Sequence, residues 1–254
     1  MSSTLRAAAA AMILTWAVAG TAMAEEVPWA VNIGRSLNEA ADSGKPLLVD
    51  VWAIWCVPCK AMDETTYRDP AVIEAAEAFV PLKVDHDVQE NFVVRHNVEA
   101  LPVVLFLDGK AREITRMLGL IETAPLLETM EAVRRGYAGY LKAVGELKDP
   151  DAVEATASYL FEVGNPGGAA DHLRRGLKAT KGAPAERRER LELWMAESLC
   201  LAEGPRAAAG VFERLSKKAA DPWVKNVARE GLVLARQGAE EEAPCRSRLS
   251  TSPS

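Results

Sequence analysis

The apolar run Leu47–Val51 leads into two cysteines that lie two residues apart, Cys56 and Cys59. The run LLVDV is almost continuously apolar, which is typical of a strand covered on both faces of a sheet. The residues that follow the cysteines, KAMDETTY, continue as a predicted helix. A cysteine pair at a strand-to-helix junction allows three interpretations: a redox couple, half of a metal site, or two cysteines that are close by chance.

The redox couple is favoured by the chemistry of the motif. A zinc site here would lack two of its four ligands, because no second C-x-x-C and no histidine at ligand spacing accompanies the pair. At a helix N-terminus, unpaired N–H groups and the helix dipole stabilise a thiolate. We therefore expect Cys56 to be the nucleophile and Cys59, about one turn further on, to be the resolving thiol. A structural disulfide is the alternative. No metal and no cofactor is expected.

Other segments before residue 120 complete an α/β pattern. The expected order is helix, strand, helix, helix, strand, strand, strand, helix, with crossover helices between the early strands and a hairpin at the edge. The signals are a helix ended by Gly44 and Pro46, a helix beginning at Asp69-Pro70, the strands PLKVD and VVLFL, a tight turn at Asp108-Gly109 into KAREITRM, and a last helix from Thr123.

Several of these segments resemble the thioredoxin family. VDVWAIWCVPCK has the family's strand, buried aspartate, two tryptophans and C-x-P-C-K, and ALPVVLFLDGK resembles its cis-proline segment. SGKPLLVD and CKAMDETTYRDPAVIEAA resemble more closely the secreted thiol:disulfide interchange branch, which includes the C-terminal domain of DsbD. The resemblance covers roughly residues 27–135 and implies an α/β thioredoxin fold, a central mixed sheet flanked by helices.

The resemblance also implies roles for residues outside the cysteine pair. Pro102 should form a cis peptide beside the disulfide, which leaves the Leu101 backbone free to pair with a substrate strand. Asp50 should be the buried carboxylate that handles the proton of Cys59, and Trp55 should flank the exposed sulfur. Without the resemblance, Pro102 is an ordinary proline at a strand start. Asp50 would still need a partner or a proton, since a buried carboxylate otherwise costs free energy.

Three positions depart from the family pattern. Val57 follows the first cysteine where many thioredoxins have glycine, and Ile54 stands where they often have an acid. Pro81 occupies the position of a strand lysine near the buried aspartate. Lys83, two residues on, lies on the same face of that strand and is a candidate substitute. These departures leave the redox potential open.

After residue 120 the sequence becomes helical, with Ala, Leu, Glu and Arg at helical spacing. Helix starts are expected at Pro150, Pro184 and Pro222, spaced by 34 and 38 residues, and Pro166 and Pro205 lie in similar turns 39 apart. Near-regular helix pairs resemble degenerate tetratricopeptide repeats. An irregular helical bundle is the alternative.

The two remaining cysteines lie in this second half. Cys200 is expected to be a buried small residue on a helix, and Cys245 lies in a polar tail. A bridge between them is left open by the sequence.

The N-terminus carries the signals of a secreted protein. One basic residue, Arg6, precedes the apolar run AAAAAMILTWAVAG, which ends in TAMA before EE. This pattern predicts a signal peptide over residues 1–24, cleaved after Ala24, and a periplasmic location. An uncleaved N-terminal anchor is the alternative. The remaining chain has 29 basic against 36 acidic residues, a net charge of −7, and no basic aromatic patch, which argues against a nucleic-acid partner.

These observations predict a signal peptide (1–24), a thioredoxin-like domain (25–135), a helical TPR-like domain (140–238) and a disordered tail (239–254). The expected function is a thiol–disulfide oxidoreductase that reduces protein disulfides, is recharged by a membrane electron donor and holds a protein partner on its helical repeats. The alternative is a chaperone or scaffold protein whose redox activity is secondary.

Overall fold

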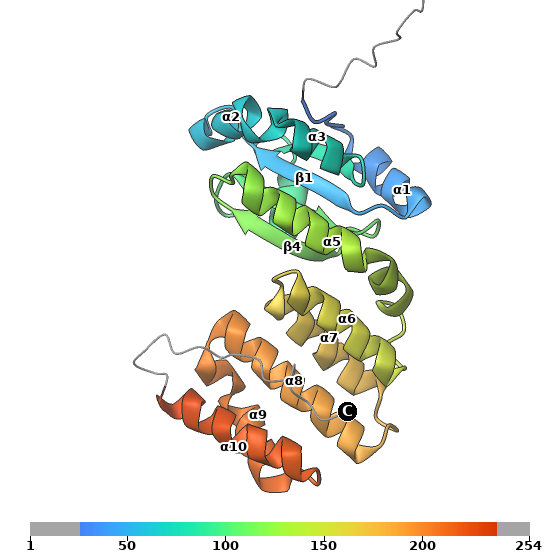
Figure 1. The fold of residues 1–254 in the computed structure, drawn as a ribbon, viewed down its shortest axis with the longest axis vertical. Helices are drawn as coiled ribbons and strands as arrows, with labels where there is room; N and C mark the ends of the chain where they lie inside the picture. The colour runs from blue at the N-terminus through green and yellow to red at the C-terminus, as the bar shows by residue number, and fades with distance from the viewer. Residues whose placement is uncertain (1–25, 238–254) are drawn as a thin grey trace, which may run out of the picture.

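The computed structural model describes residues 26–237 (Figure 1). The predicted signal peptide and the predicted tail therefore lie outside the described residues, as does Cys245. Within residues 26–237, no helix has both the length and the apolar character that a membrane crossing requires.

The N-terminal half contains a four-stranded mixed sheet with the strand order β2-β1-β3-β4. The central strand β1 pairs parallel with β2 and antiparallel with β3, and β3 pairs antiparallel with β4. A parallel pair requires a crossover connection, whereas an antiparallel pair can close as a hairpin, and both connections occur where the sequence predicts them. The strands are β1 (Leu47–Trp52), β2 (Val80–Asp85), β3 (Val103–Leu107) and β4 (Glu113–Leu118).

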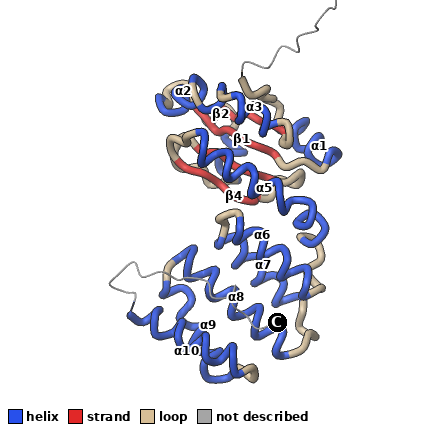
Figure 2. Tube along the Cα trace, in the orientation of Figure 1, coloured by secondary structure: helices blue, strands red, loops and turns tan. Residues whose placement is uncertain are grey.

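Helices cover both faces of this sheet (Figures 1 and 2). One core contains Val49 of β1 together with residues of α1 and α4, and the other contains Leu48 together with residues of α2, α3 and α5. The sheet is therefore the middle of three layers, the arrangement of a thioredoxin fold. The helices are α1 (Ile33–Ser43), α2 (Val57–Glu64), α3 (Pro70–Ala76), α4 (Glu90–Arg95) and α5 (Thr123–Ala143), with a 3-10 turn at Thr66–Arg68.

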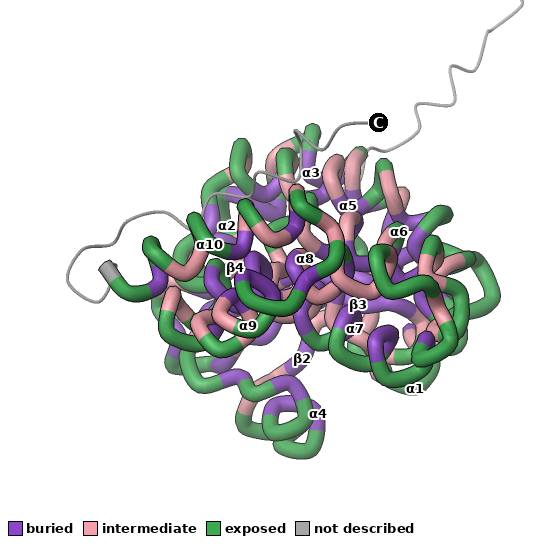
Figure 3. Tube along the Cα trace, turned by 90° about the horizontal axis from the view of Figure 1, so that it is seen from below, coloured by how far each residue is buried: buried purple, intermediate pink, exposed green. Residues whose placement is uncertain are grey.

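Helix α4 and the β3–β4 turn differ from the sequence prediction. The sequence pattern does not predict helix α4, because the helix has six residues and no side-chain cap at Gln89. Its buried residues Phe92 and Val93 hold it in place, and α4 has both buried and exposed parts (Figure 3). The β3–β4 turn is longer than a tight hairpin, and its left-handed residue is Ala111. Gly109 is needed for a different reason: a Cβ there would lie 2.6 Å from the backbone nitrogen of Ala41 in α1.

The C-terminal half consists of antiparallel helices that stack in chain order (Figure 2). Each begins at or directly after a proline that the sequence marks as a helix start. The arrangement as successive hairpins agrees with the predicted helix pairs, while their membership in the tetratricopeptide class stays a prediction. The helices are α6 (Pro150–Glu162), α7 (Pro166–Ala179), α8 (Ala185–Glu203), α9 (Pro205–Lys218) and α10 (Pro222–Gln237).

The two halves are packed together through α5 and α6. The apolar core on the α5 side of the sheet continues without interruption into α6, α7 and α8. The Tyr159 hydroxyl of α6 donates to the Val133 carbonyl at 2.9 Å, and the ring of Tyr159 lies 5.0 Å from that of Tyr140. Asn165 Nδ2 donates to the Ile114 carbonyl of β4 at 2.8 Å. Because α5 extends to residue 143, the segment between the two expected domains is helical.

Two glycines of α5 offer a matched test of this packing. A Cβ on Gly136 would lie 2.3 Å from the Tyr159 ring, whereas a Cβ on Gly139 would meet no atom within 4 Å. We expect Gly136→Ala to lower the free energy of unfolding by about 1–3 kcal/mol through overpacking. Gly139→Ala should raise it by up to about 1 kcal/mol, the difference in helix propensity. Urea denaturation followed by circular dichroism measures both, and an equal effect of the two substitutions would contradict the close α5–α6 contact.

Candidate functional site

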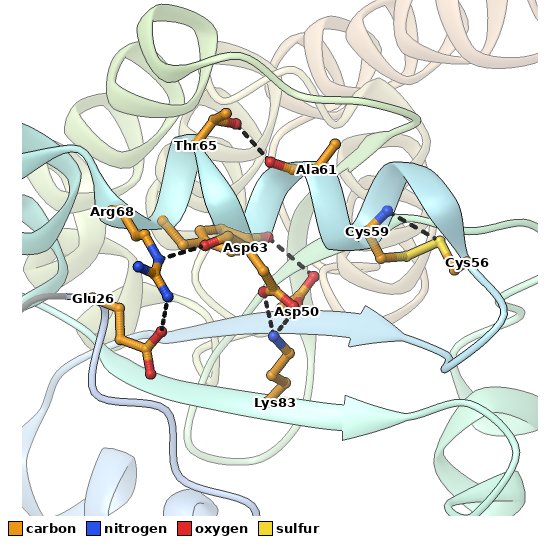
Figure 4. Close-up of polar contacts among 10 residues, drawn as sticks. Glu26, Asp50, Cys56, Cys59, Ala61, Asp63, Thr65, Arg68 and Lys83 are labelled. Atoms are coloured by element: carbon orange, nitrogen blue, oxygen red, sulfur yellow. Dashed lines mark hydrogen bonds and ion pairs between the residues drawn. A yellow bond between two sulfur atoms is a disulfide. The ribbon is translucent and has the colours of Figure 1, made fainter.

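The two cysteines form a disulfide at the start of α2 (Figure 4). Cys56 is the N-cap of this helix, and its sulfur accepts a hydrogen bond from the Cys59 backbone N–H at 3.2 Å. The Cys56 N–H donates to the Ala53 carbonyl at 3.0 Å, which closes the turn between β1 and α2. A thiolate on Cys56 would lie where helix N–H groups and the dipole stabilise negative charge.

Both cysteines are covered in this state. Cys56 is 3% and Cys59 2% exposed, and they cluster with Ala53, Trp52 and Leu101. The sequence leads one to expect an exposed first sulfur, whereas the structure exposes its neighbours instead. Ile54, Trp55 and Val57, which flank Cys56 in the chain, are all more than half exposed, and we call these three side chains the apolar rim.

The peptide bond between Leu101 and Pro102 is cis, as the resemblance implies. Leu101 packs against the cysteine cluster, and the Pro102 carbonyl accepts a hydrogen bond from the Gly119 N–H at 2.9 Å. This segment leads directly into β3, which pairs antiparallel with β1. Because α2 follows the end of β1, the segment lies beside the start of α2. The structure thus brings Cys56, Cys59, Leu101 and Pro102 together.

Asp50 lies in the middle of β1 and is 1% exposed. Its side chain is on the same face of the sheet as Leu48, the face that α2 covers (Figure 4). The Tyr67 hydroxyl donates to Asp50 Oδ1 at 3.0 Å. Burial is the largest influence on this carboxyl and raises its pKa to about 6, against the lowering effects of Lys83 and Tyr67.

Lys83 is the ionic partner of Asp50. The two residues are direct neighbours in the β1–β2 register, and Lys83 Nζ lies 3.6 Å from Asp50 Oδ2. The amine also pairs with Asp63 of α2 and lies 5.2 Å from the centre of the Trp52 ring. Lys83, two residues after Pro81 on the same face of β2, is thus the lysine that pairs with Asp50, as the same-face spacing in the sequence suggests.

The indole ring of Trp55 is held in place by the carboxylate of Asp87. Its indole Nε1 donates to Asp87 Oδ2 at 2.7 Å, and His86 Nδ1 is 2.9 Å from Asp87 Oδ1. These hydrogen bonds lower the pKa of Asp87 below its ordinary value. Asp87 lies in the turn after β2, so the end of this strand fixes the orientation of the rim tryptophan.

Sequence reasoning missed Tyr67, Asp63 and Asp87. Asp63 lies in α2 and Tyr67 in the 3-10 turn after it. No periodicity in these segments marks a residue as facing a buried carboxylate. Asp87 follows the strand end in the pattern Asp85-His86-Asp87, which is ordinary for a loop. Among the described residues, no group of three or more His, Cys, Asp or Glu is placed to hold a metal ion.

The fold and the paired cysteines define a thioredoxin-like domain. Residues 29–109 match the sequence profile of the family described as thioredoxin-like, which is about a third of the chain. The domain has the Cys56–Cys59 pair of the disulfide oxidoreductases at the helix start.

Among known proteins, the chain is similar to thiol:disulfide interchange protein DsbD. The DsbD proteins of Escherichia coli strains CFT073 and K12 are each 37% identical over 86 residues, 32% of this chain. The chain spans only 15% of the length of these relatives.

Two solved structures are similar to part of this chain. The C-terminal domain of Neisseria meningitidis DsbD shares 21% identity, with a TM-score of 0.36 over 41% of this chain and 97% of that one. A Thermus thermophilus thioredoxin shares 24% identity, with a TM-score of 0.39 over 42% of this chain and 87% of that one.

The raised pKa of Asp50 predicts how stability depends on pH. Because the carboxyl holds its proton more tightly in the folded state, the unfolded state gains by ionisation as pH rises from about 4 through 6, and folding stability falls. Asp50→Asn removes this loss. We expect it to raise the free energy of unfolding of the oxidised protein by about 1–3 kcal/mol at pH 8 and to change it little at pH 4.

Asp87→Asn is the matched control for this measurement by urea denaturation. The pKa of Asp87 is lowered, so its charge favours the folded state above pH 4, and its replacement should lower stability at pH 8. A loss of stability at pH 8 in Asp50→Asn as well would contradict the assignment of Asp50 as a destabilised buried carboxylate.

Proposed function

We propose that this chain is a periplasmic thiol–disulfide oxidoreductase that reduces protein disulfides through Cys56 and Cys59. The observation that carries the proposal is the position of Cys56 as the N-cap of α2, beside the Leu101–Pro102 segment. The similarity to thiol:disulfide interchange proteins over this domain supports the same reaction class. The signal-like N-terminus supports the compartment.

In the reaction, the Cys56 thiolate attacks one sulfur of a substrate disulfide. A bond forms between Cys56 and that sulfur, the substrate bond breaks, and the second substrate sulfur leaves as a thiolate. The Cys59 thiolate then attacks Cys56, which releases the substrate as a dithiol and leaves the Cys56–Cys59 disulfide. Two electrons pass from the protein to the substrate, so a further dithiol donor must restore the protein; we propose a membrane protein for this step.

Asp50 is suited to take the proton of Cys59 in the second step. With a pKa of about 6, the carboxyl is mostly ionised at pH 7, yet its basicity exceeds that of an ordinary aspartate. Helix α2 carries Cys59 over the sheet face that holds Asp50 (Figure 4). Lys83 and Tyr67 hold the carboxylate in position and limit how far its pKa rises.

Substrate contact is proposed at the rim. The exposed apolar side chains Ile54, Trp55 and Val57 would meet an unfolded or extended segment, and the backbone of Leu101 would pair with it. Asp87 fixes the Trp55 ring and so limits the entropy lost on binding.

The second candidate function is a binding protein whose partner docks on the helices. The continuous core between the halves favours a fixed spatial relation of the helices to the redox site, which suits either function. The effect of cysteine substitutions distinguishes the two candidate functions. An oxidoreductase needs both cysteines for catalytic turnover of disulfides, whereas a binding protein with secondary redox activity would not need them for its main role.

Cysteine substitutions test the proposal and the two roles together. Insulin reduction by dithiothreitol should be accelerated by the native protein and fall to the uncatalysed rate in Cys56→Ser. Cys59→Ser should instead accumulate mixed disulfides through Cys56, since the resolving thiol is missing. Equal activity of Cys56→Ser and the native protein would overturn the enzymatic proposal, and mixed disulfides held by Cys59 in Cys56→Ser would reverse the two roles.

The direction of electron flow follows from the residues around the pair. Val57 and Pro58 provide no imidazole to stabilise a thiolate, and the Asp50 charge disfavours one. Both features favour the disulfide, so we expect a reduction potential nearer to thioredoxin's, about −270 mV, than to DsbA's, about −120 mV. Equilibration with glutathione, read by tryptophan fluorescence, measures it; a midpoint above about −180 mV would mean that the protein is an oxidant.

A further inference from the structure

The helical half has a basic groove that is lined by residues of α7, α8 and α9. It consists of two adjoining hollows, of about 380 and 290 Å³. Both are lined by Lys181, Arg188, Glu192 and Arg214, so they form one continuous surface.

Positive charge dominates this groove. Its lining has six basic side chains and two acidic ones, although residues 140–237 as a whole have 16 basic against 14 acidic residues. The basic residues are Arg174, Lys178, Lys181, Arg188, Arg214 and Lys218, and the acidic ones are Glu189 and Glu192.

Both acidic residues are already engaged within the fold. Glu189 accepts hydrogen bonds from the backbone N–H groups of Ala220 and Asp221 at 2.8 and 3.0 Å. Glu192 pairs with Arg214 at 2.9 Å. These contacts direct the two carboxylates toward α9 and the start of α10, and neither forms an ion pair with the remaining lysines of the groove.

Three lysines of the groove have no acidic partner among the described residues: Lys178 of α7, Lys181 of the following turn and Lys218 of α9. All three are exposed. Arg188 donates to the carbonyls of Leu177 and Thr180 and thereby keeps the end of α7 against α8. The unpaired charges thus border both hollows from α7, the turn and α9.

The floor of the groove is apolar. Leu177, Met195 and Leu215 line the hollows between the charged side chains, and Ala183, Ala185 and Ala219 line the hollow near the turn. A uniformly charged polyanion would leave this apolar surface uncovered. An acidic polypeptide with interspersed apolar side chains would satisfy both the lysines and the floor.

We propose that this groove binds an extended acidic segment of a partner protein, with carboxylates on Lys178, Lys181 and Lys218 and apolar side chains on the floor. Binding here is separate from the thiol–disulfide reaction, because none of these residues belongs to the site around Cys56. The groove would give the helical half a partner of defined chemistry.

Fluorescence anisotropy with the full chain tests this proposal. The probe is a fluorescein-labelled dodecapeptide in which glutamates alternate with leucines and serines. We expect the double variant Lys181→Glu/Lys218→Glu to weaken its binding at least ten-fold, and added salt to weaken binding to the native protein. The matched control, Lys142→Glu/Lys148→Glu, makes the same charge change at exposed lysines outside the groove and should bind like the native protein.

Two comparisons make the outcome decisive. Both double variants should keep native circular dichroism and native insulin reduction, which separates loss of the groove from loss of the fold or of the redox function. A peptide with lysine in place of glutamate should not bind. Absence of binding by the native protein, equal weakening by the two double variants, or tighter binding of a single-stranded DNA dodecamer through the same lysines would overturn the proposal.

Discussion

A carboxylate buried in the central strand of a sheet is the constraint on which the N-terminal half depends. Asp50 interrupts a strand that is otherwise apolar on both faces, and an isolated charge there would destabilise the fold. The neighbouring strand supplies Lys83 in register, and the segment after α2 supplies the Tyr67 hydroxyl. Lys83 also forms an ion pair with Asp63 of α2. The lysine therefore links α2 to the sheet and helps to fix the helix whose N-cap is Cys56.

The helical half is built onto this unit through a shared core. Helix α5 packs against the sheet with one part of its length and against α6 with another, and Gly136 permits the close approach of Tyr159. The contact between Asn165 and the Ile114 carbonyl adds a direct link to β4. A partner held on the helices would therefore keep a defined position relative to the disulfide, which gives a physical basis for joining a redox domain to helical hairpins.

Much of this arrangement follows from local sequence. The run LLVDV, the prolines at helix starts and the Asp69 cap predict elements through short-range preferences, and the structure confirms them. The C-x-x-C motif likewise predicts its place at a helix start. Lys83 could only be named as a candidate, because its pairing depends on the register of two strands that are about 33 residues apart in the chain. The roles of Tyr67 and Asp87 and the formation of α4 depend on tertiary contacts, which the apolar pattern of a single segment does not predict.

The proposed transfer of the Cys59 proton to Asp50 requires the buried Asp50 carboxyl to be electrostatically coupled to the cysteine pair. A carbon-detected NMR titration of the Asp50 side chain, in the disulfide and the dithiol forms, measures this coupling. We expect a pKa near 6 in the disulfide form and a different value after reduction. The pKa should rise further in Tyr67→Phe, which removes the hydrogen bond to the ionised carboxyl. An ordinary pKa near 4 that is the same in both redox forms would contradict the proposed proton transfer.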